Sequence, residues 1–119
     1  FEYAHRLGKP ITLEEFGFPR DDLAYDSQSR VTWRDKYFNA ILNSIYQNAA
    51  SGGASAGSNF WAWGGEGRAA DTTYIWEGGD NYMGDPPQEP QGLYSVLNSD
   101  TSTINILNNH ASKMIELSR

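Results

Sequence analysis

The feature that most limits the fold of this chain is one long helical pattern between only two strand-like runs. The first run extends from Ile11 to Glu15, and the second extends from about Gly57 to Trp63. Parallel strands need a crossover between them, and the helical pattern over roughly residues 29–50 can supply it. A parallel sheet also needs both of its faces covered, which two strands cannot achieve. The chain is therefore predicted to need further strands that it does not contain.

The central helix is recognised by apolar residues at four-residue steps, and Gly52-Gly53 ends it. These apolar residues are Trp33, Tyr37, Ile41, Ile45 and Ala49. A second long helix follows N-cap candidates at 100–102 and carries an apolar stripe of its own. That stripe consists of Ile104, Leu107, Ala111, Met114 and Ile115. Residues 1–7 match the last turns of another helix, which Gly8 ends.

The order helix, strand, helix, strand, helix predicts an α/β fold with right-handed crossovers. We interpret it as the C-terminal part of a (β/α)8 barrel, carrying strands seven and eight with their helices. Residues 1–119 would form one segment of a single catalytic domain whose N-terminal strands lie elsewhere, since Phe1–Gly8 does not resemble a natural protein start. Part of a doubly wound sheet is the alternative, and the side chains at the strand ends favour the barrel.

Side chains suited to chemistry lie where each predicted strand ends. Glu14 and Glu15 end the first run, and Trp61 and Trp63 end the second. Strand side chains alternate between faces, so if Leu13 and Glu15 face the barrel axis, Glu14 faces the helix layer and needs a partner there. The alternative is that Glu14 and Glu15 are both solvated carboxylates at the strand end. Trp61, if it faces the axis, lies beside Glu15. A carboxylate next to a flat aromatic ring is what an enzyme that cleaves carbohydrates requires.

Three motifs resemble glycoside hydrolase family 5. Glu15-Phe16-Gly17 resembles the nucleophile strand of that family, which ends in Glu, an aromatic residue and Gly. Phe60-Trp61 resembles the family's next strand, where a Trp forms the floor of the subsite for the sugar to be cleaved. The segment 84–96, followed by residues 100–104, resembles the microbial β-mannanase branch of the family. Together these motifs cover nearly the whole chain.

The resemblance implies a retaining endo-glycosidase that cleaves β-1,4-mannosidic bonds in mannan or glucomannan, with Glu15 as the nucleophile and without a cofactor or metal. Trp61 would bind the sugar, and Trp63, one step further along the strand, is a second candidate. The family's acid/base Glu follows an Asn, and no Asn-Glu pair occurs in this chain. A companion chain or segment with the N-terminal barrel strands must therefore supply that residue. The protein is expected to be secreted or periplasmic.

The long irregular segment 64–98 holds further candidates, because loops of this length in compact domains are often functional. Its aromatic side chains are Tyr74, Trp76 and Tyr82. They either line outer substrate subsites or hold the loop against the barrel. Trp76 is the candidate for substrate binding. Its acidic side chains, Asp80, Asp85 and Glu89, could bind Ca²⁺. Acidic residues among Gly and Pro more often form turns, so no metal site is predicted.

The composition excludes other classes of partner. The net charge of −6 and the pI near 4.7 argue against nucleic acid and anionic membranes, because both bind basic surfaces. The absence of Cys excludes disulfides and thiolate metal ligands. Two other functions stay open. One is a non-catalytic carbohydrate-binding module, which the two long helices oppose, and the other is a family 5 enzyme that acts on a different β-glycan such as cellulose.

Overall fold

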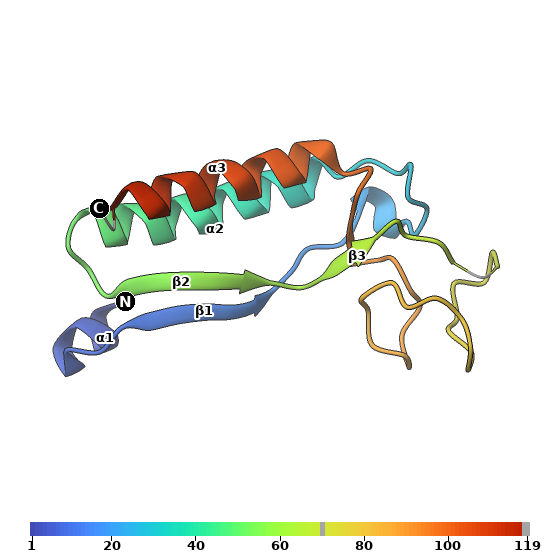
Figure 1. Cartoon of the computed structure of the whole chain (residues 1–119), viewed down its shortest axis with the longest axis horizontal. Coiled ribbons are helices and arrows are strands. Elements are labelled where there is room, and N and C mark those ends of the chain that lie inside the picture. The colour runs from blue at the N-terminus through green and yellow to red at the C-terminus, as the bar shows by residue number, and fades with distance from the viewer. Residues whose placement is uncertain (70, 118–119) are drawn as a thin grey trace.

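The structure, a computed structural model, describes residues 1–69 and 71–117 and places two long helices over short parallel strands (Figure 1). In chain order the elements are α1 (Glu2–Leu7), β1 (Ile11–Phe16), η1 (Asp21–Leu23), α2 (Thr32–Ala50), β2 (Ser55–Phe60), β3 (Trp63–Gly65), β4 (Val96–Leu97) and α3 (Thr101–Leu117). The long helices and β1 lie where the sequence patterns predict them. No helix in the described ranges is long and apolar enough to cross a membrane.

The strands form two parallel pairs rather than one. β1 and β2 pair with Leu13 opposite Ser58 and Phe16 opposite Phe60, and α2 is the crossover between them. The α/β order that the sequence predicts is therefore confirmed. The second expected strand is shorter than predicted, because β1 ends at Phe16 and offers no partner beyond Phe60. The chain continues as β3, which pairs with β4 inside the segment expected to be irregular.

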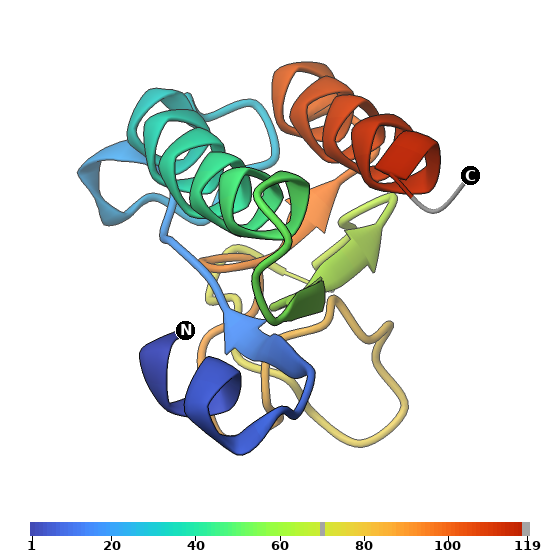
Figure 2. The ribbon, with the colours of Figure 1, turned by 90° about the vertical axis from the view of Figure 1, so that its left-hand side faces the viewer.

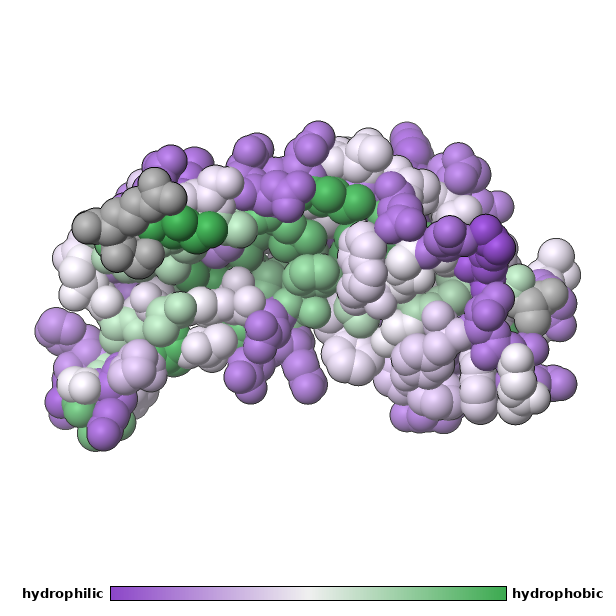
Figure 3. Space-filling model, viewed as in Figure 1, coloured by the Kyte–Doolittle hydropathy of each residue, from purple (hydrophilic) through white to green (hydrophobic). Residues whose placement is uncertain are grey.

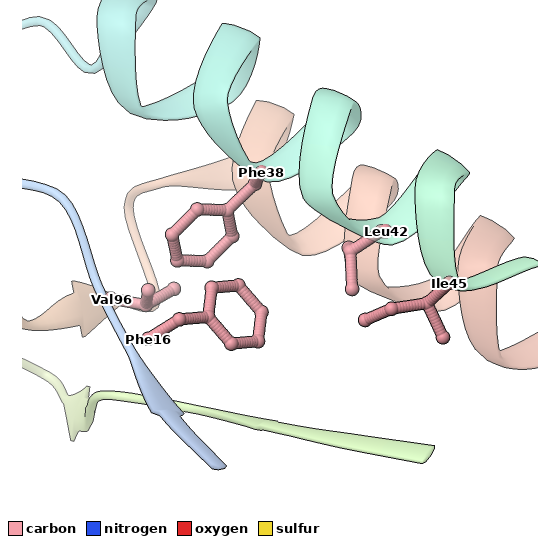
Figure 4. Packing of buried hydrophobic residues seen from close by; sticks show 5 residues of the cluster. All are labelled: Phe16, Phe38, Leu42, Ile45 and Val96. Carbon is pink, nitrogen blue, oxygen red and sulfur yellow. The ribbon is translucent and has the colours of Figure 1, made fainter. Parts of the chain in front are cut away.

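One apolar cluster holds α2 against β1 and β4 (Figure 4). Its buried members are Phe16, Phe38, Leu42, Ile45 and Val96. The ring centroids of Phe16 and Phe38 lie 5.2 Å apart. Residues of α3 pack against the same cluster, among them Ile104, Leu107 and Met114. Both long helices therefore pack against the end of β1.

The buried face of α2 differs from the stripe that the sequence predicts. Trp33 is 59% exposed, whereas Phe38, Leu42 and Ile45 are buried. Strict four-residue steps drift by about 40° at each step around a helix of 3.6 residues per turn. The buried residues instead follow steps of four and three, which keep them on one side. Trp33, although part of the apolar pattern, therefore lies outside the buried face of α2.

The sheet is open on the side of β1. Ile11 and Leu13 remain 38% and 39% exposed, and they line a hollow of about 250 Å³ between β1 and α2. Figure 2 shows α2 and α3 side by side on one side of the strands. Figure 3 shows apolar surface between the helices and the strands, open to solvent. Apolar surface of this kind is normally covered by neighbouring elements of a fold.

Candidate active site

Glu15 lies one residue before the end of β1, at a bulge in the pairing with β2. Between Leu13 and Phe16 β1 advances three residues, while β2 advances only two. Glu15 adopts a left-handed conformation there, with a φ of 55°, and its side chain is exposed. Bulges re-aim side chains and are common beside active sites. The carboxylate is thus accessible at the strand tip, where the sequence predicts a reacting group.

The bulge overturns the expected alternation of side chains along β1. Leu13 lines the hollow against α2 and so lies on the helix side of the strand. The expected alternation places Leu13, together with Glu15, on the side of the barrel axis. Phe16 is also on the helix side, because the extra residue resets the alternation. Glu14 is exposed, which agrees with the alternative of a solvated carboxylate at the strand end rather than with burial in the helix layer.

Gly17 brings the tip of β1 and the end of β2 into direct contact. The Trp61 backbone N–H donates to the Phe16 carbonyl oxygen at 2.7 Å. A Cβ atom on Gly17 would lie only 2.7 Å from the Trp61 carbonyl oxygen, closer than such atoms can approach. The Glu-Phe-Gly motif therefore needs its Gly so that Trp61 can lie beside the residues that follow Glu15.

Replacing Gly17 by Ala in the full-length protein is expected to lower the free energy of unfolding by about 1–3 kcal/mol, because backbone must move to admit the methyl group. Gly57→Ala is the matched control, since a Cβ there meets only the Thr12 methyl group, at 3.9 Å. Urea denaturation measures both variants. Equal stability of the two variants would show that the contact between Gly17 and Trp61 is not tight.

The two strand-end tryptophans have different surroundings. Trp61 is half-buried at the end of β2, and Trp63 is 54% exposed in β3. Next to Trp63, the glycine-rich turn 64–68 opens into a hollow of about 360 Å³ that Asn81 and Tyr82 also line. An exposed indole beside an open polar hollow is a suitable surface for a sugar ring.

Trp76 makes its polar contact within its own loop. The indole N–H donates to the Asp80 carbonyl oxygen at 3.1 Å, and the Asp80 carboxylate accepts the Glu77 N–H at 2.9 Å. The ring is half-buried. These contacts favour the role of holding the loop together, and substrate binding by Trp76 stays a prediction. Among residues 1–69 and 71–117, no three acidic or His side chains gather as a metal site would require.

The family of this chain follows from its similarity to known proteins. The profile described as "GH family 5 beta-mannosidase-like" matches residues 1–119. The chain belongs to glycoside hydrolase family 5. This assignment confirms the family predicted from the motifs around Glu15 and Trp61.

Several family members share this segment. Mannan endo-1,4-beta-mannosidase 3 of Arabidopsis thaliana is 32% identical over 108 residues, which is 91% of this chain and 21% of that protein. The family 5 mannosidase of Rhizomucor miehei is 35% identical, with a TM-score of 0.82 over 98% of this chain and 29% of that one. A variant of it, solved in complex with mannosyl-fructose, has the same TM-score. The chain thus spans about a fifth of those curated relatives and under a third of the solved structure.

Two further features of this family 5 chain are built from buried polar side chains; the turn role of Asp85 was predicted, whereas the ionic cluster was not. The first is the loop that carries Asp85. Asp85 is fully buried and accepts hydrogen bonds from the Gly92 N–H at 2.6 Å and the Ser95 hydroxyl at 2.8 Å. The Gln91 amide donates to the carbonyl oxygens of Asp85, Pro86 and Glu89 at 2.9 to 3.1 Å. Asp85 therefore acts in a turn, as is common for Asp among Gly and Pro.

The second feature is a buried ionic cluster of Arg20, Arg34 and Asp100. Arg20 binds both carboxylate oxygens of Asp100, at 2.9 and 2.7 Å, and Arg34 reaches the second of them at 3.2 Å. Both guanidinium groups are fully buried. Asp100 thus serves the cluster and the Leu97 N–H, rather than capping α3 with its side chain as predicted. The sequence signal that could have revealed the cluster is Arg34, four residues before Phe38 on the apolar face of α2.

Burial lowers the pKa of the Arg34 guanidinium to about 10, and the positive charge of Arg20 adds to this effect. The negative charges of Asp100, Asp35 and Asp85 oppose it. A pKa near 10 still keeps Arg34 protonated at neutral pH. The cluster therefore holds charged donors beneath the strand tips, where charged hydrogen bonds are stronger than neutral ones.

Proposed function

We propose that this chain forms part of a retaining endo-β-1,4-mannanase and supplies its nucleophile, Glu15. The observation that carries the proposal is an exposed carboxylate at a strand tip, one residue before the backbone bond between Phe16 and Trp61, in a family 5 chain. In a retaining enzyme one carboxylate attacks the anomeric carbon, and a second carboxyl group, about 5 Å away, protonates the leaving oxygen. Glu15 is accessible for the first of these roles.

Three tryptophans are proposed to bind the substrate. Trp61, whose backbone is fixed beside the residues after Glu15, would stack on the sugar that is attacked. Trp63 is exposed beside the hollow at the turn 64–68, where a neighbouring sugar unit could bind. Trp76 would contact units further along the chain. Manno-oligosaccharides and β-mannan are the proposed ligands, which fits the mannosyl ligand of the Rhizomucor miehei variant.

The chain is proposed to hold strands seven and eight of the barrel within a single catalytic domain. The open edge of β1 and the exposed Ile11 and Leu13 support this placement, because further strands and helices would cover them. A companion chain or segment with the earlier strands would complete the sheet and supply the acid/base Glu. Since polymeric mannan lies outside cells, the enzyme is proposed to be secreted or periplasmic.

The substrate is tested by comparing polysaccharides on the full-length enzyme. Hydrolysis of glucomannan and β-mannan is expected to be faster than that of carboxymethylcellulose, and proton NMR should show products with retained anomeric configuration. A chelator such as EDTA should leave the rate unchanged, because the mechanism needs no metal. Faster cleavage of carboxymethylcellulose would assign the enzyme to another β-glycan, and inverted products would exclude Glu15 as the nucleophile.

A further inference from the structure

Backbone hydrogen bonds link the ends of β1, β2 and β4 to one another. The Trp61 N–H donates to the Phe16 carbonyl oxygen, and the Val96 N–H donates to the Ala62 carbonyl oxygen, both at 2.7 Å. These bonds tie the end of β1 to the end of β2, and the end of β2 to β4. One more backbone bond, from the Arg20 N–H to the Leu93 carbonyl oxygen at 3.0 Å, joins the residues that follow Glu15 to the segment before β4.

The Arg34 side chain reinforces this link with three further hydrogen bonds. Its Nε donates to the Phe18 carbonyl oxygen at 2.8 Å, three residues after Glu15. Its two terminal nitrogens donate to the carbonyl oxygens of Ser95 at 2.9 Å and Leu93 at 3.0 Å. Ser95 directly precedes Val96 of β4, so Arg34 connects the end of β1 to β4. The backbone bonds of Val96 and Trp61 then connect β4 to the end of β2, and the end of β2 to β1, which closes a ring. We call this the Arg34 ring.

We propose that Arg34 is a positioning residue, which fixes the Glu15 carboxylate relative to Trp61 through the Arg34 ring. The proposal rests on the proposed function, in which Glu15 attacks the sugar held by Trp61. A guanidinium group suits the task, because its planar fork can reach three carbonyl groups at fixed angles. Lys carries the same charge at a single point and cannot reproduce that geometry.

Position matters for the reaction because displacing a reacting group by about 1 Å can cost about 100-fold in rate. The residues around Glu15 make the site sensitive to such a displacement. Glu15 lies at a bulge in a left-handed conformation, where the pairing of β1 with β2 is interrupted between Leu13 and Phe16. The bond to Phe18 is therefore a side-chain hydrogen bond that holds the backbone three residues after this irregular position.

The test compares two Arg-to-Lys variants of the full-length enzyme. Arg34→Lys removes the bonds to Phe18 and Leu93, whereas Arg20→Lys disturbs the same buried cluster without touching either of those carbonyl groups. Both are assayed on mannohexaose at a temperature well below unfolding, and near-UV circular dichroism gives the folded fraction. For Arg34→Lys we expect kcat per folded enzyme to fall about 10- to 100-fold while KM changes less than threefold. For Arg20→Lys we expect kcat within about threefold of the wild type.

A purely structural role for Arg34 predicts a different result. Both variants would then lose thermal stability while kcat per folded enzyme stayed equal to the wild type, which would overturn the proposal. If Arg34→Lys does not fold, Asp100→Asn replaces it, because that change keeps the shape of the cluster and removes the charge that holds Arg34. A lowered kcat with unchanged KM for Asp100→Asn would support the ring, and an unchanged kcat would overturn it.

The proposed function can fail separately from this inference. If Glu15→Gln keeps its activity, the nucleophile assignment is wrong, whatever the Arg variants do. If Glu15→Gln is inactive and Arg34→Lys matches Arg20→Lys, the nucleophile assignment stands and only the positioning role of Arg34 is lost.

Discussion

Replacing Glu15 by Gln in the full-length enzyme is expected to lower kcat on β-mannan by about 1,000-fold or more. The amide cannot form the covalent bond to the anomeric carbon that a retaining mechanism needs. The free energy of unfolding should change little, because the Glu15 side chain is exposed. Initial rates of reducing-sugar release, together with a thermal unfolding curve for the same preparation, measure both effects.

Glu14→Gln is the matched control for this experiment. It makes the same chemical change one residue earlier, at a second exposed carboxylate of β1. Its kcat should stay within a few-fold of the wild type. A Glu15→Gln enzyme that retains more than about a tenth of its activity, or a Glu14→Gln enzyme that loses as much as Glu15→Gln, would remove Glu15 from the role of nucleophile.

Residues 1–119 expressed alone are expected to have no mannanase activity and no cooperative unfolding transition. Two-stranded sheets are marginal in water, and the open edge of β1 leaves Ile11 and Leu13 exposed. The acid/base carboxyl group would also be missing. Far-UV circular dichroism during heating and an assay on β-mannan measure the two expectations. Activity should return only when a polypeptide with the remaining barrel strands is added.

Other results from the same preparation would be equally informative. A cooperatively folding and active monomer would refute the view that this segment needs further strands. A folded, inactive monomer that binds mannan would instead support the non-catalytic carbohydrate-binding function. Sedimentation analysis is needed beside both measurements, because self-association of the open edge of β1 could imitate folding.

The sequence patterns predicted the parts of the fold that depend on local periodicity. The positions of α2 and α3 follow from apolar residues that recur along each helix, and β1 follows from a short apolar run after Lys9-Pro10. Parallel pairing of β1 with β2 follows from the helix between them. The contact between the end of β1 and Trp61 could be predicted for the same reason, since parallel strands end at the same edge.

The parts that sequence reasoning missed depend on residues far apart along the chain. Arg20 and Asp100 are 80 positions apart, and no periodic pattern marks such a pair. β4 is only two residues long, too short to produce a strand signal. The bulge at Glu15 was also missed, and it breaks the period of two from which the faces of Leu13 and Glu14 were inferred.

The loop that carries Asp85, Gln91 and Ser95 is held by main-chain carbonyl groups and buried polar side chains, and none of these contacts involves Trp63 or Tyr82. The residues that stabilise this loop are therefore different from the aromatic residues exposed beside it. Exchanging the outward-facing aromatic residues should alter which branched or mixed polysaccharides are accepted at little cost in folding. Under the proposed function, this loop is accordingly a practical starting point for changing which polysaccharides are recognised.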